Sequence, residues 1–395
     1  MTNLAPPPTT ARVLWAIPAV YFLFVAAEFV VLTSLSLGLT QAGVSAFAVG
    51  ALASLFWVGI FVASTRAHAA VVRLGHARTF LAATAASTVA VLSFALHDSY
   101  AGWLAGAFAL GAGGGLVWVS GESWLAEAAP RERRGFYVGL FETAVGLGMV
   151  AGPALLPVAL RLDVAPLHLG LALMAAAFAA SWPLLRAAEP PADDDGAATG
   201  NAVIDWRAVA VPLAAVAALS GLMESGISSL LPSISMRLGF AIDAAAALGA
   251  VIGAGSALLQ SPFGWLADRT GLPRTMALAW AAIVTATAAL LLGAAQPQAV
   301  LWPVGFVLGG VGGAVYTLVV IELGHRLAGG GLVKAMSLLV TAYTAGTAGG
   351  PALGGWLFDR AGLAGLALAL LLLGLCGSVL AWRALRAPAQ PMLST

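Results

Sequence analysis

Three glutamates, Glu28, Glu142 and Glu224, stand inside long apolar stretches of the sequence. An ionisable side chain in such a place is costly and is a functional candidate by default. The sequence places no basic residue at a comparable depth, so the three carboxyl groups are not all expected to stay ionised in surroundings of low dielectric. A neutral glutamate can carry a proton, whereas an ionised one can attract a cation. The alternative is structural: a protonated glutamate that is hydrogen-bonded across a helix interface.

Aromatic and hydroxyl-bearing side chains accompany the glutamates on the same apolar stretches. Together they could line a mostly apolar pocket that binds a lipophilic, aromatic or cationic solute through stacking, cation–π contact and a few hydrogen bonds. For each of these residues taken alone, packing against lipid explains its position equally well. The candidates are Phe24, Trp57, Trp118, Phe141, Gln260, Tyr316, Thr341 and Tyr343, with Ser225 as a further hydroxyl.

The composition places these residues in a membrane protein. The chain has 395 residues, of which 61% are apolar and 9% are charged, and its mean hydropathy is +0.96. Ordinary soluble domains are about a quarter charged. The net charge of +1 indicates no nucleic-acid partner. The single cysteine, Cys376, excludes an internal disulfide and cannot form a structural zinc site alone.

Two further features argue against an enzyme or a nucleotide-driven pump. The run Gly113-Gly114-Gly115 has no strand before it, so we interpret it as helix packing rather than as a dinucleotide-binding loop. A phosphate-binding Gly-Lys-Ser loop and a metal-ligand cluster are also missing from the sequence. We therefore expect neither a cofactor nor a metal.

Turn residues and charges divide the chain into twelve long, continuous apolar segments, which favour membrane helices over the short alternating strands of a barrel. They cover roughly 13–37, 44–65, 78–96, 101–122, 135–160, 166–186, 207–232, 244–266, 275–294, 299–322, 333–357 and 364–383. The longest polar break, 187–206, has the composition of a flexible linker. It predicts an N-terminal six-helix bundle, 1–186, and a C-terminal one, 207–395.

The basic residues predict the orientation of the spans. If both termini are cytoplasmic, 15 of the 18 Lys and Arg residues fall on the cytoplasmic side, because only Arg161, Arg237 and Arg360 lie outside (18 − 3 = 15). This asymmetry agrees with the positive-inside rule.

The two halves resemble each other. Leu110–Trp118 aligns without gaps on Leu308–Tyr316, and the same offset places Gly152-Pro153 on Gly350-Pro351. An offset shorter by two residues places Glu28 on Glu224. Chance similarity between Ala- and Gly-rich helices is the alternative. A parallel repeat of this kind is typical of secondary transporters that bind substrate between the halves and rock one half against the other.

On these residues the chain resembles the major facilitator superfamily, which implies an all-α integral membrane fold with twelve transmembrane helices in two pseudo-symmetric six-helix bundles. The resemblance rests on Gly264, Asp268, Arg269, Gly271 and Arg274 in the second half, and on a decayed copy with Arg73, Gly75 and Arg78 in the first. In that family these residues form a cytoplasmic latch. The full set of expected latch residues is Arg73, Gly75, Arg78, Glu122, Arg133, Arg134, Gly264, Asp268, Arg269, Gly271 and Arg274.

The latch has a physical basis, since a carboxylate at one helix end can face the positive N-terminus of another helix. By analogy with the family, Asp268 and Arg269 would dock near the start of the fifth span. The alternative is that these charges only set the topology.

Two further patterns are similar to subgroups of this family. Gly139, Gly148 and Gly152-Pro153 reproduce most of a motif of its proton-coupled exporters, although tight helix packing is an alternative explanation. The segment Glu122-Ser123-Trp124-Leu125 resembles bacterial drug/proton antiporter-like members.

We therefore expect a secondary transporter of the bacterial inner membrane. It is expected to work as a monomer by alternating access and to couple the export of small lipophilic or cationic compounds to protons. One alternative is the uptake or facilitated passage of a neutral or zwitterionic metabolite. Another is a receptor or scaffold that transports nothing.

Overall fold

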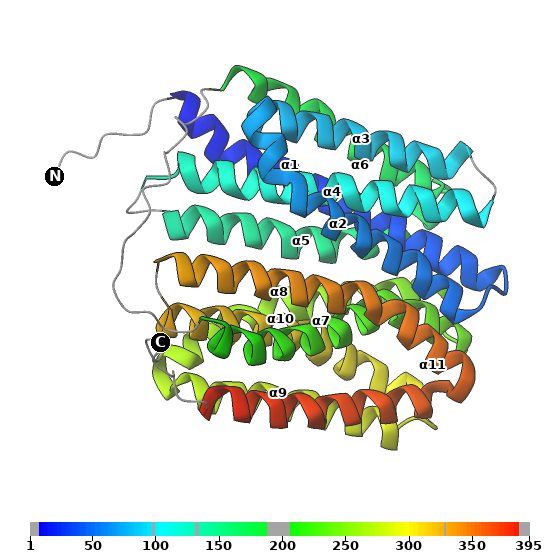
Figure 1. Cartoon of the computed structure of the whole chain (residues 1–395). Coiled ribbons are helices and arrows are strands. Elements are labelled where there is room, and N and C mark those ends of the chain that lie inside the picture. The colour runs from blue at the N-terminus through cyan, green and yellow to red at the C-terminus, as the bar shows by residue number, and fades with distance from the viewer. Residues whose placement is uncertain (1–7, 97–98, 131–133, 188–205, 328, 387–395) are drawn as a thin grey trace. The chain divides into compact units, whose positions relative to one another are not determined.

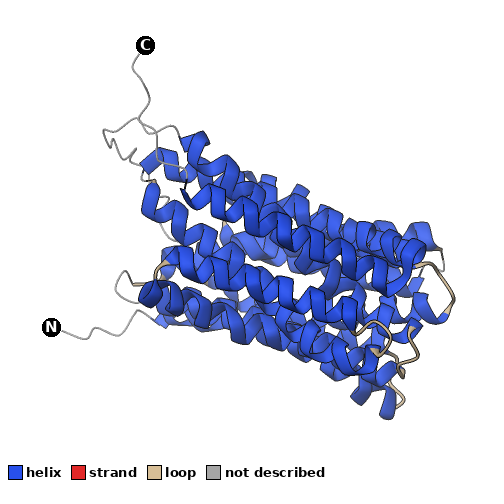
Figure 2. Ribbon diagram, turned by 90° about the horizontal axis from the view of Figure 1, so that it is seen from below, coloured by secondary structure: helices blue, strands red, loops and turns tan. Residues whose placement is uncertain are grey.

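The computed structural model describes residues 8–96, 99–130, 134–187, 206–327 and 329–386, and within these ranges the regular elements are helices (Figure 2). Helices satisfy their backbone polar groups internally, which a chain surrounded by lipid requires. The elements are α1 (Pro8–Gln41), α2 (Ala46–Leu74), α3 (His76–Leu96), α4 (Tyr100–Ala128), α5 (Arg134–Arg161), α6 (Pro166–Ser181) with the 3₁₀ turn η2 (Trp182–Arg186), α7 (Trp206–Arg237), α8 (Ile242–Thr270), α9 (Leu272–Leu292), α10 (Pro297–Arg326) and α11 (Gly329–Arg386).

The last helix accounts for two of the predicted spans. In the described residues, eleven helices are long and apolar enough to cross a membrane, and the last of them runs over 53 residues. One span needs only about 20 residues. α11 is interrupted at Gly362, whose φ of 63° and ψ of −164° are not helical. Figure 1 shows α11 reversing its direction between its orange and its red part. The prediction of twelve membrane helices is thus confirmed.

Several helices run past the ends predicted from hydropathy. α2, for example, continues to Leu74 and includes Arg66 and His68, although the apolar segment was expected to end near residue 65. Both side chains are exposed, so the helix can carry them without burying a charge.

The chain forms two compact units. Unit 1 comprises residues 1–38 and 55–192, and unit 2 comprises residues 39–54 and 193–395. The predicted linker, 187–206, lies outside the described residues except for its two end residues. Its role as a boundary between bundles therefore stays a prediction.

In unit 1, glycines allow α4 to pack closely on its neighbours. A Cβ atom built on Gly111 would lie 1.9 Å from the backbone oxygen of Phe56 in α2, and one built on Gly59 would lie 2.2 Å from the backbone oxygen of Phe108. Lipid provides no hydrophobic drive for helix association, so close contact through small residues has to hold helices together. The prediction that the run Gly113–Gly115 serves helix packing is confirmed, because these glycines face α3, α1 and α2.

Unit 2 repeats these contacts. A Cβ atom on Gly255 in α8 would lie 1.9 Å from the backbone oxygen of Phe306 in α10, and one on Gly309 would lie 2.5 Å from the backbone oxygen of Ile252. Gly255 and Phe306 stand at the repeat positions of Gly59 and Phe108. The internal repeat seen in the sequence is therefore also present in the helix packing of each unit.

Residues 39–54, which belong to unit 2, make several polar contacts with the rest of that unit. The carboxylate of Asp359 in α11 accepts hydrogen bonds from the backbone N–H groups of Ala46 (2.9 Å) and Phe47 (2.8 Å), which begin α2. The hydroxyl of Ser54 accepts one from the backbone N–H of Ala352 (3.1 Å). The first N–H groups of a helix have no partner within it, and a carboxylate suits the positive end of the helix dipole.

We predict that Gly255→Ala destabilises unit 2, because its new methyl group cannot fit beside the backbone oxygen of Phe306. The expected loss is about 1–3 kcal/mol in the free energy of unfolding. A thermal melt of the purified protein in detergent measures it. Gly264→Ala in the same helix is the control, since no atom lies within 4 Å of its added Cβ. Equal melting temperatures for the two variants would contradict the packing argument.

We also predict that Asp359→Ala loosens the start of α2, because two backbone N–H groups lose their acceptor. The loss should be about 0.5–2 kcal/mol, as for the removal of a helix-capping carboxylate. Hydrogen exchange at Ala46 and Phe47 should accelerate, while the exposed Asp243→Ala should leave it unchanged. Unaltered exchange in Asp359→Ala would refute the prediction.

Candidate functional site

Glu28 lies in the interior of unit 1. It is on α1 and is only 6% exposed. A Cβ atom built on Gly114 in α4 would lie 2.5 Å from its Oε1 and 3.7 Å from the ring of Phe24. Among the described residues, Oε1 has no hydrogen-bond partner. A buried polar atom without a partner is rare and points either to a functional role or to a partner that arrives from outside.

Glu224 has a different setting in unit 2. It lies on α7, is half-buried, and faces Gly312 of α10, where an added Cβ would lie 3.1 Å from its Oε2. The hydroxyl of Tyr343 in α11 donates a hydrogen bond of 2.9 Å to this Oε2. The rings of Tyr343 and Tyr316 lie 4.5 Å apart between centroids, at an interplanar angle of 42°. Three helices thus bring a carboxylate and two phenol rings together.

The two glutamates occupy matching places in the repeat. Each lies on the first helix of its half against a glycine of the fourth helix, and these glycines, Gly114 and Gly312, align with each other. Each glutamate is also isolated in its own helix. The nearest charged residue to Glu28 in α1 is Arg12, and the nearest to Glu224 in α7 is Arg237. These lie 16 and 13 residues away (28 − 12 and 237 − 224), about 24 and 20 Å at 1.5 Å per residue.

The third predicted glutamate, Glu142, lies on α5. Its side chain is outside the described part of the structure, so its role stays a prediction.

Two of the predicted cavity-lining aromatics are fully buried. Phe141 stacks on Tyr21 with ring centroids 4.5 Å apart, and Phe24 stacks on the same ring at 6.1 Å. Neither ring has measurable exposure. In this structure they pack the interior of unit 1 rather than line an open cavity.

The other predicted lining residues are at least partly exposed, apart from Ser225. Trp57, Trp118, Gln260 and Tyr316 are half-buried, and Thr341 is exposed. Gln260 donates a hydrogen bond of 3.0 Å to the hydroxyl of Ser256. Ser225 is buried, and its hydroxyl contacts the backbone oxygens of Gly221 and Thr347, so it links α7 to α11.

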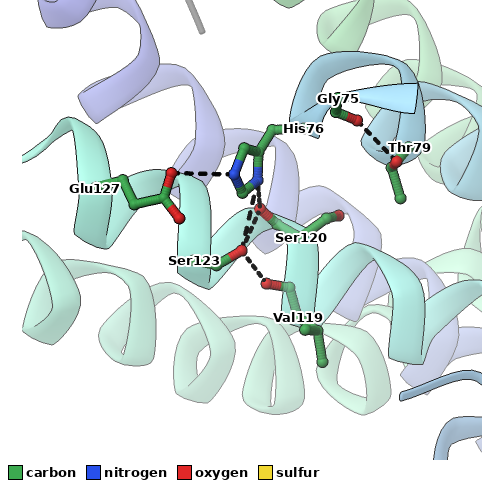
Figure 3. A network of polar contacts seen from close by, with 7 residues as sticks. All are labelled: Gly75, His76, Thr79, Val119, Ser120, Ser123 and Glu127. Carbon is green, nitrogen blue, oxygen red and sulfur yellow. Dashed lines mark hydrogen bonds and ion pairs between the residues drawn. The ribbon is translucent and has the colours of Figure 1, made fainter. Parts of the chain in front are cut away.

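The junction of α2 and α3 contains a cluster around a histidine that the sequence analysis missed. His76 is 7% exposed and begins α3 directly after Gly75, whose φ is 81°. Its Nδ1 lies 3.2 Å from the backbone oxygen of Ser120, and its Nε2 lies 3.1 Å from Oε2 of Glu127 (Figure 3). The imidazole also stacks on Trp124 with centroids 6.0 Å apart.

This cluster gives the Glu122-Ser123-Trp124-Leu125 segment a structural meaning. Ser123 and Trp124 face His76, whereas Glu122 is half-buried. The only signal in the sequence was a histidine directly after the glycine of the decayed motif. Arg73 and Arg78, expected to belong to the latch, are exposed on either side.

The junction of α8 and α9 in unit 2 carries the more complete motif. Gly271 ends α8 with a φ of 88°, and the guanidinium of Arg269 lies 4.0 Å from the ring centroid of Trp265. Asp268 borders a cavity of about 430 Å³ together with Glu322 and His325. Gly264 and Arg274 flank the junction.

The polar contact at this end of α10 is also one that the sequence analysis did not predict. Glu322 pairs with Arg326 at 2.5 Å, and Arg326 donates to the backbone oxygen of Leu385 at 2.7 Å. Arg326 therefore ties the end of α10 to the end of α11.

The expected docking of Asp268 and Arg269 near the start of the fifth span is not described by the structure. Arg133 and the side chain of Arg134 lie outside the described residues.

Comparisons with known proteins agree with this architecture. The family model of the Major Facilitator Superfamily matches residues 19–328 and 213–394. YfkF of Bacillus subtilis (strain 168), an uncharacterized MFS-type transporter, is 22% identical over 325 residues, which are 80% of each chain. YcaD of Escherichia coli (strain SE11), with the same description, is 24% identical over 323 residues, which are 81% of this chain and 82% of YcaD.

Solved structures support the fold alone, because their sequences are distant. A bacterial homologue of the human lysosomal transporter Spinster, inward-facing and occupied, has a TM-score of 0.76 at 16% identity and covers 97% of this chain and 98% of its own. The nucleoside transporter NupG has a TM-score of 0.72 at 13% identity and covers 94% of this chain and 98% of its own.

The histidine cluster leads to a prediction. His76→Ala should destabilise unit 1 by about 1–3 kcal/mol, because it removes a buried ring together with its hydrogen bonds. Arg78→Ala, two residues further on and exposed, should change the stability by less than about 0.5 kcal/mol. Thermal melts in detergent compare the two. Equal effects would show that His76 is not held as described.

Proposed function

Because the chain belongs to the major facilitator superfamily, a family of membrane transporters rather than enzymes, we propose that it is a proton-coupled secondary transporter that exports small lipophilic or cationic compounds. The observation that carries this proposal is the matching placement of Glu28 and Glu224, each isolated in its apolar helix and held against a glycine. Carboxyl groups that stand alone inside membrane helices mark substrate and proton paths.

The proposed cycle uses competition between substrate and proton at one or more of these carboxyl groups. A glutamate that has lost its proton can take up a cationic or polar group of the substrate, and protonation from the other side releases that substrate. Substrate and proton then move in opposite directions, as alternating access allows. Glu142, on α5, is the third candidate for this exchange.

The glycine pattern on α5, which resembles that of proton-coupled exporters, supports export as the direction. Gly148 and Gly152, which belong to the pattern typical of proton-coupled exporters, lie against the helix that carries Glu28. A Cβ atom on Gly148 would lie 2.8 Å from Cβ of Val25, and one on Gly152 would lie 2.6 Å from Cβ of Phe29. The glycines of this pattern therefore pack directly against α1, which carries the candidate proton carrier Glu28.

We extend the proposal to location and topology. The protein would act in the bacterial inner membrane, with both termini and the linker 187–206 in the cytoplasm, because the Lys and Arg residues are distributed so asymmetrically. The junctions at Gly75 and Gly271 would then lie on the cytoplasmic side, where Asp268, Arg269 and their partners would form the latch. The substrate and the proton would be its partners in transport, with the chain working as a monomer.

Vesicles with an imposed pH gradient test the function. We expect proton influx to drive tetraphenylphosphonium in the opposite direction, and we expect Glu28→Gln or Glu224→Gln to lower this coupled flux about tenfold or more, equivalent to at least 1.4 kcal/mol. Asp243→Asn, exposed at the start of α8, is the control that should keep full flux.

The alternatives give different results. Movement of a solute in the same direction as protons would indicate uptake, and binding without flux would indicate a receptor. If Glu28→Gln, Glu142→Gln and Glu224→Gln all keep full coupled flux, the carboxylate mechanism is wrong.

A further inference from the structure

The two matching glutamates have different neighbours. At the repeat position of Tyr343 the first half carries Val145, because Gly346 aligns with Gly148. Valine has no hydroxyl group, so unit 1 lacks at this position the donor that Glu224 has in unit 2. Glu28 is accordingly buried with an oxygen that has no partner among the described residues, while Glu224 is half-buried and hydrogen-bonded.

The neighbours of Glu224 suit a cation. Tyr343 binds Oε2 and so orients the carboxylate, and the ring of Tyr316 lies beside that of Tyr343. The electron-rich faces of phenol rings attract organic cations, and a carboxylate supplies the opposite charge. Along α11, the basic residue nearest to Tyr343 is Lys334, nine residues away (343 − 334), or about 14 Å.

The helix packing also brings Gln260 to this place. Gly312 and Gly313 of α10 face Glu224 and Gln260, so the backbone of α10 carries no side chain there. Glu224, Tyr316, Tyr343 and Gln260 are each only half-buried. These four side chains thus keep part of their surface exposed, whereas Glu28 is buried.

We propose that Glu224, Tyr343 and Tyr316 form a subsite for the positively charged centre of a lipophilic organic cation, and that Glu28 is no part of it. This inference rests on the proposed transport function and assigns the substrate class to one of its two glutamates. Glu224 contacts the charge, Tyr343 is a positioning residue for the carboxylate, and Tyr316 supplies a second ring face.

Equilibrium binding to the full-length protein in detergent tests the subsite without any ion gradient. The probes are tetraphenylphosphonium, a cation, and triphenylphosphine oxide, a neutral molecule of related shape. We expect Glu224→Gln to raise the Kd of the cation about tenfold or more and that of the neutral probe less than about twofold. Glu28→Gln should change both by less than about twofold.

Two further variants separate charge from structure. Glu224→Asp keeps the charge and should keep the preference for the cation, even if its stability falls. Tyr343→Phe removes only the hydroxyl and should weaken cation binding about threefold to tenfold, with the neutral probe unaffected. A merely structural role for Tyr343 would weaken both probes alike.

Several outcomes would overturn the proposal. The wild type would fail to bind tetraphenylphosphonium, or Glu224→Gln would weaken the binding of both probes equally. Alternatively, Glu28→Gln would raise the Kd of the cation as much as Glu224→Gln does. If only the proposed transport function is wrong, coupled flux will be absent, but the variants will still show the expected changes in Kd. Coupled flux without this binding pattern would refute the subsite alone.

Discussion

Direct contact between glycine and the backbone of a neighbouring helix is the constraint on which the rest of the structure depends. In lipid, apolar side chains gain little from meeting one another, so helices need close van der Waals contact to stay together. Gly111 against Phe56 and Gly255 against Phe306 bring helix backbones so near that a single methyl group would not fit. The same kind of contact fixes the glutamates, because Gly114 and Gly312 leave the space that the two carboxyl groups occupy. The backbone packing of each unit therefore determines where charge can lie inside it.

Although the backbone packing is repeated, the side chains near the two matching glutamates differ between the halves. Tyr343 in one half and Val145 in the other stand at one repeat position. Tyr343 donates a hydrogen bond to its glutamate, whereas Oε1 of Glu28 has no partner among the described residues. Duplicated transporter halves can thus keep their helix packing, which depends on glycines, while the side chains at the site diverge. Figure 1 shows the helices of each unit that carry these residues, α1 and α4 in unit 1 and α7, α10 and α11 in unit 2.

The fold was largely predictable from the sequence, whereas the contacts of the site were not. Twelve apolar segments suffice to predict twelve helices, since the cost of an unpaired backbone in lipid leaves few other solutions. The isolation of Glu28 and Glu224 was equally visible, because it depends on the local sequence. The partners of His76, Asp359 and Arg326 were not, because they come from residues far along the chain and the contacts depend on how the helices rotate. For the same reason hydropathy could not show that Phe24 and Phe141 point inward.

The break at Gly362 has a consequence for how the protein is made. The two halves of α11 are joined by a turn with almost no slack, since helical residues continue on both sides of a single non-helical glycine. With so short a joint, the second helix has to start where the first one ends and run back beside it. The C-terminal pair of helices is therefore expected to enter the membrane together as a hairpin during biosynthesis. Glycine suits this position because it adopts a positive φ without steric cost.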